Sequence, residues 1–483
     1  MFNFKRNKDI KITRVQGIIR QDKILTCKYQ NFTDFMNFTD SVLNNIYIKD
    51  VWTLFTGTAV AQIIGLAFYP VLTRLFLPEE FGVFYFFMTT ASILSIITTG
   101  GYEKAFVIPE SDNTARHLLW FSLMLSAGVT ILCLIISLFL HQWGGVYFQT
   151  EHQQHILWLI PVYSFLFGLY RIFQNWSMRE KKFNHVSTSN IIRSGSLSIF
   201  QTGFGIFQSG SIGLVLGGCL SQFIPGLFLI GKDKKAIEGI NLKGVREASV
   251  QGKEYRRFPF YKMPSDLINE ISVQLPLYVF KSLFSNLVVG LYSLPQKILN
   301  QPSKFIGQAV ADVYYRKASE LYNQDKDLSE ITFSTFKTLF KIGIIPFAVT
   351  LFWGEDMFSF IFSKEWSASG KIAAYLSPWL LFVFAGSPIS SVFIIKKRLG
   401  LSFYLNLLLL FFRIASLLIG SMIIKNFEVT VILFAGSGFL YWICLTFFSL
   451  HLSGVKILRS VLFTVIVIIL VIIPLGLIKR FLL

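Results

Sequence analysis

Charged side chains are scarce in this sequence. Only 15% of its 483 residues are Asp, Glu, Lys or Arg, whereas 53% are hydrophobic. Soluble globular chains carry about 25% charged residues, because their surfaces must be hydrated. The scarcity therefore excludes an ordinary soluble enzyme or binding domain, and it favours a protein whose outer surface contacts lipid.

Cysteine is also rare. The four cysteines lie far apart, at Cys27, Cys133, Cys219 and Cys444. No CxxC pair and no His/Cys cluster occurs, so the spacing supports neither a disulfide framework nor a zinc site. We expect no metal, no cofactor and no catalytic residue.

Acidic residues are few beside basic ones, 27 against 45, which gives a formal charge of +18. In a soluble chain this excess would indicate a nucleic-acid partner. Here the basic residues fall mostly between apolar runs, which is the distribution expected of cytoplasmic loops in a membrane protein. We expect membrane lipid and no nucleic acid as a partner.

Long apolar runs are what the sequence has in abundance, with 51 phenylalanines among them. A helix needs about 20 apolar residues to cross a membrane. We predict an all-α integral membrane protein with 12 or 13 transmembrane helices. The expected spans are 51–76, 83–108, 117–140, 154–176, 186–208, 211–231, 258–283, 286–314, 332–353, 371–395, 400–424, 429–450 and 457–478.

The longest polar connector divides these spans into two sets. We expect an N-terminal arm without a signal peptide, an N-lobe of six helices, a basic linker, a C-lobe of six helices and an extra C-terminal helix. Their ranges are 1–50, 51–231, 232–257, 258–450 and 451–483. The arm contains "NFTD" twice, at Asn31 and Asn37, which we interpret as a small local duplication, and Met36 is a second possible start because the spans all follow it.

Connector charge predicts the orientation. Alternate connectors are rich in Lys and Arg, among them the arm, "SMREKK", the linker and "KKR" at 396–398, while "LPEEF" and "QSGS" have none. The positive-inside rule puts the N-terminus and the linker in the cytoplasm. Thirteen spans would put the C-terminus outside.

The two lobes echo one another. "YPVLTRLFLPEEFGVFY" and "LPLYVFKSLFSNLVVGLY" share a proline, a following basic residue and a closing Gly-x-x-Tyr or Gly-Leu-Tyr. Six spans separate them, so both have the same orientation. This favours two parallel repeats about an axis along the membrane normal, with a site at their interface.

Polar residues line one face of two neighbouring spans. In 258–283 they fall within a sector of roughly 140° on a helical wheel, and in 286–314 within roughly 80°. Charges inside spans cost about 2.5–3.5 kcal/mol each and usually face a bundle interior or water. The candidate cavity residues are Lys262, Asp266, Asn269, Glu270 and Gln274 in the first span and Lys297, Gln301, Lys304, Gln308 and Asp312 in the second.

Further charges lie in other spans: Glu103, Arg74, Arg193 and Arg413. The cations outnumber the carboxylates, so we predict a central cationic cavity that takes an anionic cargo. Arginine suits phosphate because it donates two parallel hydrogen bonds. Asp266, Glu270, Glu103 and the amides would line the cavity or couple ions.

Simpler explanations stay open for some of these residues. Lys104, Arg171 and Lys281 lie near span ends, where long basic side chains reach the interface. Lys262 and Asp266 are four residues apart and could form an ion pair within one helix.

Three stretches make the sequence familiar: "LFTGTAVAQIIGLAFYPVLTRLFLPEEFGVFY" at 54–85, "GGYEKAFVIPESDNTARHL" at 100–118 and "RFPFYKMPSDLINEISVQLPLYVFKSLFSNLVVGLYSLPQK" at 257–297. They resemble the Wzx-type polysaccharide flippases of the multidrug/oligosaccharidyl-lipid/polysaccharide (MOP) superfamily. Gly101 stands where many members have an arginine, so that cation role does not carry over.

The resemblance implies two six-helix lobes around a central cavity in a bacterial inner membrane. It implies transport, without enzyme activity, of an undecaprenyl-pyrophosphate-linked oligosaccharide from the cytoplasmic to the periplasmic leaflet. Such cargo supplies O-antigen, capsule or exopolysaccharide, with a polymerase and a chain-length regulator as further partners. Two alternatives stay open: a multidrug exporter of the same superfamily, and a membrane glycosyltransferase or ligase.

Overall fold

The computed structural model describes residues 46–140, 156–237 and 242–482, and the regular structure of these residues is helical throughout. Each predicted apolar range overlaps a helix. Among the described residues, nine helices are long and apolar enough to cross a membrane. The prediction of an all-α, multi-pass membrane protein is therefore confirmed.

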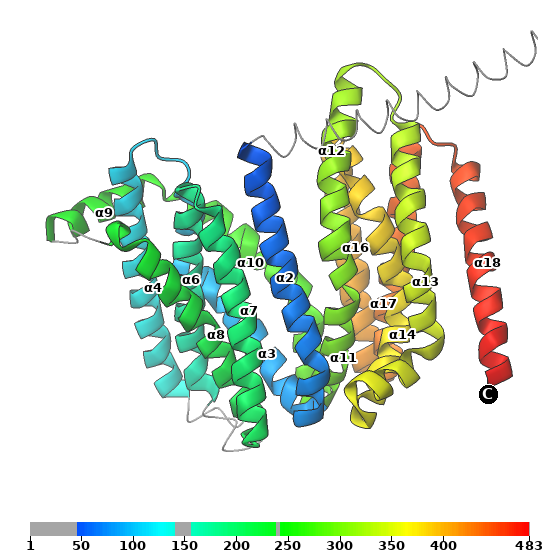
Figure 1. Cartoon of the computed structure of the whole chain (residues 1–483), viewed down its shortest axis with the longest axis horizontal. Coiled ribbons are helices and arrows are strands. Elements are labelled where there is room, and N and C mark those ends of the chain that lie inside the picture. Colours follow the sequence, from blue (N-terminus) through cyan, green and yellow to red (C-terminus); the bar gives the residue numbers. More distant parts are fainter. Residues whose placement is uncertain (1–45, 141–155, 238–241, 483) are drawn as a thin grey trace, which may run out of the picture.

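The helices that precede the linker form the first half of the molecule (Figure 1). They are α2 (Ile46–Leu75), α3 (Pro78–Thr99), α4 (Asp112–Leu140), α6 (Ile156–Arg179), α7 (Phe183–Ile206) and α8 (Gly210–Lys232). Helix α7 packs on α2 and α8, and α6 packs on α3, α4 and α8.

The span predicted at 83–108 is wrong at its end. Helix α3 stops at Thr99, and a short 3₁₀ helix, η1 (Tyr102–Ala105), follows. Gly100 and Gly101 separate the two, with φ of 59° and 73°. This left-handed backbone suits glycine and ends a helix.

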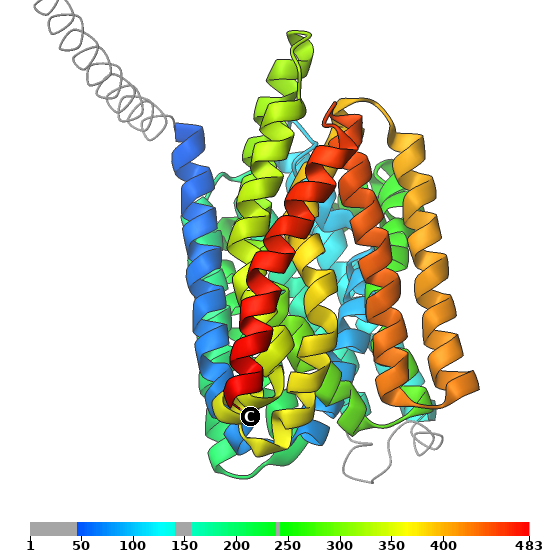
Figure 2. The same cartoon turned by 90° about the vertical axis from the view of Figure 1, so that its right-hand side faces the viewer.

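The second half begins with the π-helical turn η4 (Phe258–Lys262), which continues into α10. Within the second half, the main contacts join α13 to α14, α14 to α17 and α16 to α17. Helix α18 lies on the outside against α13 (Figure 2). The remaining bounds are α10 (Met263–Leu283), α11 (Asn286–Leu299), η5 (Ser303–Gly307), α12 (Gln308–Asn323), α13 (Ser329–Phe362), η6 (Lys364–Trp366), α14 (Ser367–Gly386), η7 (Pro388–Ser391), α15 (Val392–Ile395), α16 (Leu399–Leu418), η8 (Ile419–Ile424), α17 (Phe427–Leu452) and α18 (Ile457–Leu482).

The polar connector between the halves carries its own helices, η3 (Lys234–Ala236) and the amphipathic α9 (Leu242–Glu254). Helix α9 packs on α4. Tyr102 Oη donates a hydrogen bond to the carbonyl of Gly252 at 2.9 Å, and Trp120 Nε1 donates to that of Ala236 at 2.8 Å. These parts of the connector are therefore attached to the first half.

The two halves touch closely where α3 and α11 begin. A Cβ added to Gly82 would lie 1.7 Å from the carbonyl oxygen of Asn286, and one added to Gly290 would lie 1.8 Å from that of Pro78. Gly82 and Gly290 hold the same position in the two helices, so the contact is reciprocal, and only glycine permits such backbone approach. We call this the closed end; α9 lies at the opposite end of the molecule (Figure 1).

Candidate functional site

A cavity of about 530 Å³ lies between α3 of the first half and helices of the second half, namely α10, α11, α14, α16 and α17. It is lined by three cationic side chains and one carboxylate. Its charged, amide and hydroxyl side chains are Tyr85, Thr89, Ser92, Glu270, Ser272, Gln274, Ser293, Gln296, Lys297, Asn300, Lys304 and Arg413. The cavity therefore has an excess of positive charge.

Lys297 reaches from α11 across to the first half. Its Nζ lies 5.5 Å from the ring centroid of Tyr69 and 5.9 Å from that of Tyr85. Lys304 is near enough for the two positive charges to repel each other. Neither ammonium forms a salt bridge with a carboxylate of the described residues. Both charges remain available to a ligand.

Arg413 is held by aromatic rings as well. Its guanidinium carbon lies 5.5 Å from the ring centroid of Trp379, on α14, and 5.8 Å from that of Phe434, on α17. Its Nε is buried without a hydrogen-bond partner. A buried donor that lacks a hydrogen-bond partner raises the free energy of the folded protein. An anionic acceptor near this guanidinium would therefore be stabilising.

The carboxylate of the cavity is bound by neutral groups. Glu270 Oε1 accepts hydrogen bonds from Ser92 Oγ at 3.1 Å and from Gln274 Nε2 at 3.0 Å. Thr89 Oγ1 donates to Gln274 Oε1 at 3.4 Å. Glu270 thus links α10 to α3 and leaves the cavity cations uncompensated.

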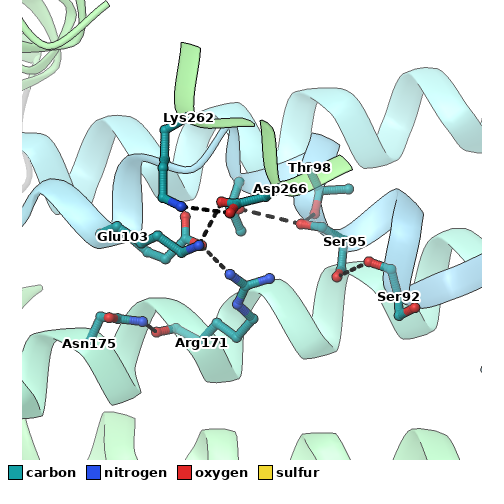
Figure 3. Close-up of polar contacts among 10 residues, drawn as sticks. Ser92, Ser95, Thr98, Glu103, Arg171, Asn175, Lys262 and Asp266 are labelled. Atoms are coloured by element: carbon teal, nitrogen blue, oxygen red, sulfur yellow. Dashed lines mark hydrogen bonds and ion pairs between the residues drawn. The ribbon is translucent and has the colours of Figure 1, made fainter. Parts of the chain in front are cut away.

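A second group of charges, the α3-end cluster, lies beyond the last turn of α3 (Figure 3). Asp266 accepts from Lys104 at 2.6 Å and from Lys262 at 2.7 Å. Arg171 Nη2 donates to Glu103 Oε1 at 2.6 Å, and the Glu103 side chain is 1% exposed. Each carboxylate here has a cationic partner.

These pairs decide two open questions. Lys262 and Asp266 do form the ion pair within one helix that their spacing allows. Lys104 and Arg171 do more than reach the membrane interface, because each binds a carboxylate: Arg171 binds the buried Glu103, and Lys104 binds the partly exposed Asp266.

Other candidate residues lie outside the cavity lining. Arg74 is at the closed end, where its guanidinium donates to the carbonyls of Pro70 at 2.6 Å and Phe360 at 3.3 Å. Arg193 lies within the first half, 5.7 Å from the ring of Tyr170. Arg74 therefore joins α2 to α13, and Arg193 faces the interior of the first half.

Four expected polar residues, three on the second polar face and one on the first, do not line the cavity. Gln301 is buried, Gln308 donates to Asp312 at 3.0 Å on exposed α12, and Asn269 of α10 is exposed. Pro302 lacks an N–H, and the π-helical turn η5 follows it. A π-helical turn changes the angle between successive residues, so a wheel drawn for a continuous α-helix misplaces residues beyond it.

Sequence reasoning missed two kinds of lining residue. Ser293, Gln296 and Asn300 share a helical face with Lys297 and Lys304, so their spacing was a usable signal. The rings of Trp379 and Phe434 come from helices distant in the sequence, and no local pattern marks them.

Within the described residues, no group of three or more His, Cys, Asp and Glu side chains could hold a metal ion. A membrane glycosyltransferase or ligase would need acidic or His groups on an outer loop. The connector that offers them, with His141, Glu151, His152 and His155, lies outside the described residues.

Comparison with known proteins places the chain in a family. Residues 71–371, more than half of the chain, match the family described as polysaccharide biosynthesis protein. The capsular polysaccharide biosynthesis protein CapF of Staphylococcus aureus is 27% identical over 150 residues, which are 30% of this chain and 37% of that protein. The chain therefore matches little more than a third of that relative's length.

Solved structures show the fold. The lipid II flippase MurJ in an inward closed conformation superposes with a TM-score of 0.61 at 14% identity, covering 89% of this chain and 99% of MurJ. An outward-facing multidrug resistance MATE family transporter of the MOP superfamily gives 0.53 at 13% identity, covering 84% and 96%. The chain shares the fold of these two structures and belongs to the polysaccharide biosynthesis protein family, as its sequence resemblance predicts.

Proposed function

We propose that this protein is a flippase for surface polysaccharide synthesis. It moves undecaprenyl-pyrophosphate-linked oligosaccharide units from the cytoplasmic to the periplasmic leaflet by alternating access. The observation that carries the proposal is the cavity between the halves. It is lined by three cations, Lys297, Lys304 and Arg413, and by a single carboxylate, Glu270. The family and the fold likeness to a lipid II flippase support it.

An anionic head group supplies the negative charge and the hydrogen-bond acceptors that the cavity cations lack. A cation taken out of water needs an opposite charge or acceptors for its N–H groups. A diphosphate offers both, and each charge-assisted hydrogen bond contributes on the order of 1.5–3 kcal/mol. Arg413 can donate two parallel bonds to one phosphate, as the planar guanidinium does elsewhere.

The membrane potential can drive the step. An anion that leaves a negative-inside cell gains about 2.3 kcal/mol per charge per 100 mV, and a diphosphate carries at least two charges. Asp266 is occupied by two lysines, which leaves Glu270 as the cavity carboxylate that could couple a cation.

Deletion and complementation test the function. In the native host without this gene, surface polysaccharide should be lost, and plasmid copies should restore it. The triple variant Lys297→Ala/Lys304→Ala/Arg413→Ala should restore little at equal membrane abundance. Lys341→Ala, an exposed lysine on α13 outside the cavity, is the matched control and should restore it fully. Full restoration by the triple variant would exclude the cationic cavity as the cargo site.

The orientation is proposed from the connector charges: α9 in the cytoplasm and the closed end outside the cytoplasmic membrane. Two exposed positions test it in a cysteine-free background, Ser249 on α9 and Glu365 at the closed end. An impermeant thiol reagent should label Glu365→Cys in intact cells and Ser249→Cys only after permeabilisation. The reverse pattern would invert the topology.

A multidrug exporter is the second candidate, because MATE transporters share the fold. An exporter of cationic drugs needs carboxylates free of partners in its cavity, whereas this cavity has three cations. Measured resistance to cationic dyes should therefore be the same with and without the gene.

A further inference from the structure

Lys297 joins the cargo cavity to the contact between the two halves. The residue belongs to α11 in the second half, and the two rings beneath its ammonium, Tyr69 and Tyr85, belong to α2 and α3 in the first half. The same side chain lines the cavity. Its position over the rings is therefore one of the contacts that an opening of the closed end would break.

The two tyrosines continue into the closed end. Their hydroxyls are 3.2 Å apart, and both side chains are buried. The ring of Phe81 lies 5.9 Å from that of Tyr85 and 5.2 Å from that of Trp366, which comes from the second half. Trp366 Nε1 in turn donates to the carbonyl of Thr73 at 3.0 Å.

The backbone contact of Gly82 and Gly290 lies in the same region, since Phe81 precedes Gly82 on α3. An alternation between two openings requires these contacts to separate. Any force that attracts the halves here favours the closed state of this end, and any ligand that removes the force favours the open one.

We propose that Lys297 couples occupation of the cavity to opening of the closed end: an anionic head group draws the ammonium off Tyr69 and Tyr85 and so weakens the contact between the halves. The inference deepens the proposed function and rests on it for the identity of the ligand. An ammonium over an aromatic face makes a weaker contact than one bound to a phosphate. The ammonium therefore moves to the phosphate when one is present.

The size of the coupling follows from the contact that is lost. Removing a cation–aromatic contact should raise the ratio of open to closed forms by about 2- to 30-fold. By linkage, opening must tighten binding of the anion by the same factor.

Distances between spin labels test the coupling. Nitroxides at Leu77 and Phe360, two exposed positions on opposite halves at the closed end, report its opening in lipid nanodiscs. Without ligand, Lys297→Gln should already raise the ratio of open to closed forms by about 2- to 30-fold. Lys341→Gln removes an exposed charge on α13 outside the cavity, and it should leave the open fraction unchanged.

The same distances measured after ligand is added distinguish this inference from the proposed function. Undecaprenyl diphosphate should raise the open fraction of the wild type and of Lys341→Gln at saturation, and it should leave the open fraction of Lys297→Gln unchanged. If Lys297→Gln behaves as wild type both without and with ligand, the coupling is overturned while the flippase proposal stands. If undecaprenyl diphosphate does not bind the wild type but Lys297→Gln opens the closed end, the cargo assignment fails and the role of Lys297 in closure is supported.

Discussion

The cavity and the α3-end cluster hold the same kinds of residue and use them in opposite ways. In the cluster, Arg171 and Lys104 each bind a carboxylate. In the cavity, Lys297 and Arg413 lie over aromatic rings and bind no carboxylate of the described residues. A cation neutralised by Asp or Glu contributes to the fold, whereas a cation held by ring faces keeps its charge for a ligand.

The largest loss of stability should appear when the buried ion pair of Arg171 and Glu103 is broken. Arg171→Ala leaves the carboxylate of Glu103, which is 1% exposed, without its cation. Removing one partner of a buried pair costs about 3–5 kcal/mol. We expect a large fall in the melting temperature of the purified protein and little folded protein in membranes. The double variant Glu103→Gln/Arg171→Met removes both charges and should recover much of the loss; a single Arg171→Ala variant that melts as wild type would break the comparison.

In the cavity, removal of a cation should weaken binding and spare the fold. Arg413→Ala should lower the affinity for undecaprenyl diphosphate by roughly 10- to 150-fold, from the loss of one charge-assisted contact. Arg413→Lys should lose less, since it keeps the charge but not the two-pronged geometry. Dissociation constants in nanodiscs and melting curves of the same samples measure both effects. A fall in melting temperature as large as that of Arg171→Ala would show that Arg413 is structural.

The smallest effect is expected at Asp266. Its side chain is 20% exposed, and the lysines that bind it are 34% and 47% exposed, so water screens the pairs. Asp266→Asn should change the free energy of unfolding by about 1 kcal/mol or less. Thermal melting of Asp266→Asn beside Arg171→Ala checks this order, and equal losses would contradict it.

The sequence predicts the fold better than the site. Apolar runs of span length specify helices wherever they occur, so the predicted spans overlap the observed helices, and errors arise at special backbone such as Gly100-Gly101. The reciprocal contact of Gly82 and Gly290 accounts for the glycine that the two echoing stretches share, because both helices come close at the same point.

The site depends on pairing across helices, which a single sequence does not encode locally. Lys297, Lys304 and Arg413 reach one cavity, but Arg74 and Arg193 are equally basic and lie elsewhere. Gln308 and Asp312 follow the π-helical turn after Pro302, and they are exposed and do not line the cavity. Counting charges in spans therefore predicts that a polar interior exists, and only the partners show which charges are free for a ligand.

Translocation in proteoliposomes tests the central claim most directly. A fluorescent lipid-linked oligosaccharide diphosphate is placed in the membrane, and an impermeant quencher reports how fast it changes leaflet. We predict that the wild type moves the diphosphate lipid faster than the corresponding neutral lipid, and that Lys297→Ala/Lys304→Ala/Arg413→Ala, with an unchanged melting temperature, does not. Equal rates for the wild type and this variant, or for the charged and neutral lipids, would contradict the account.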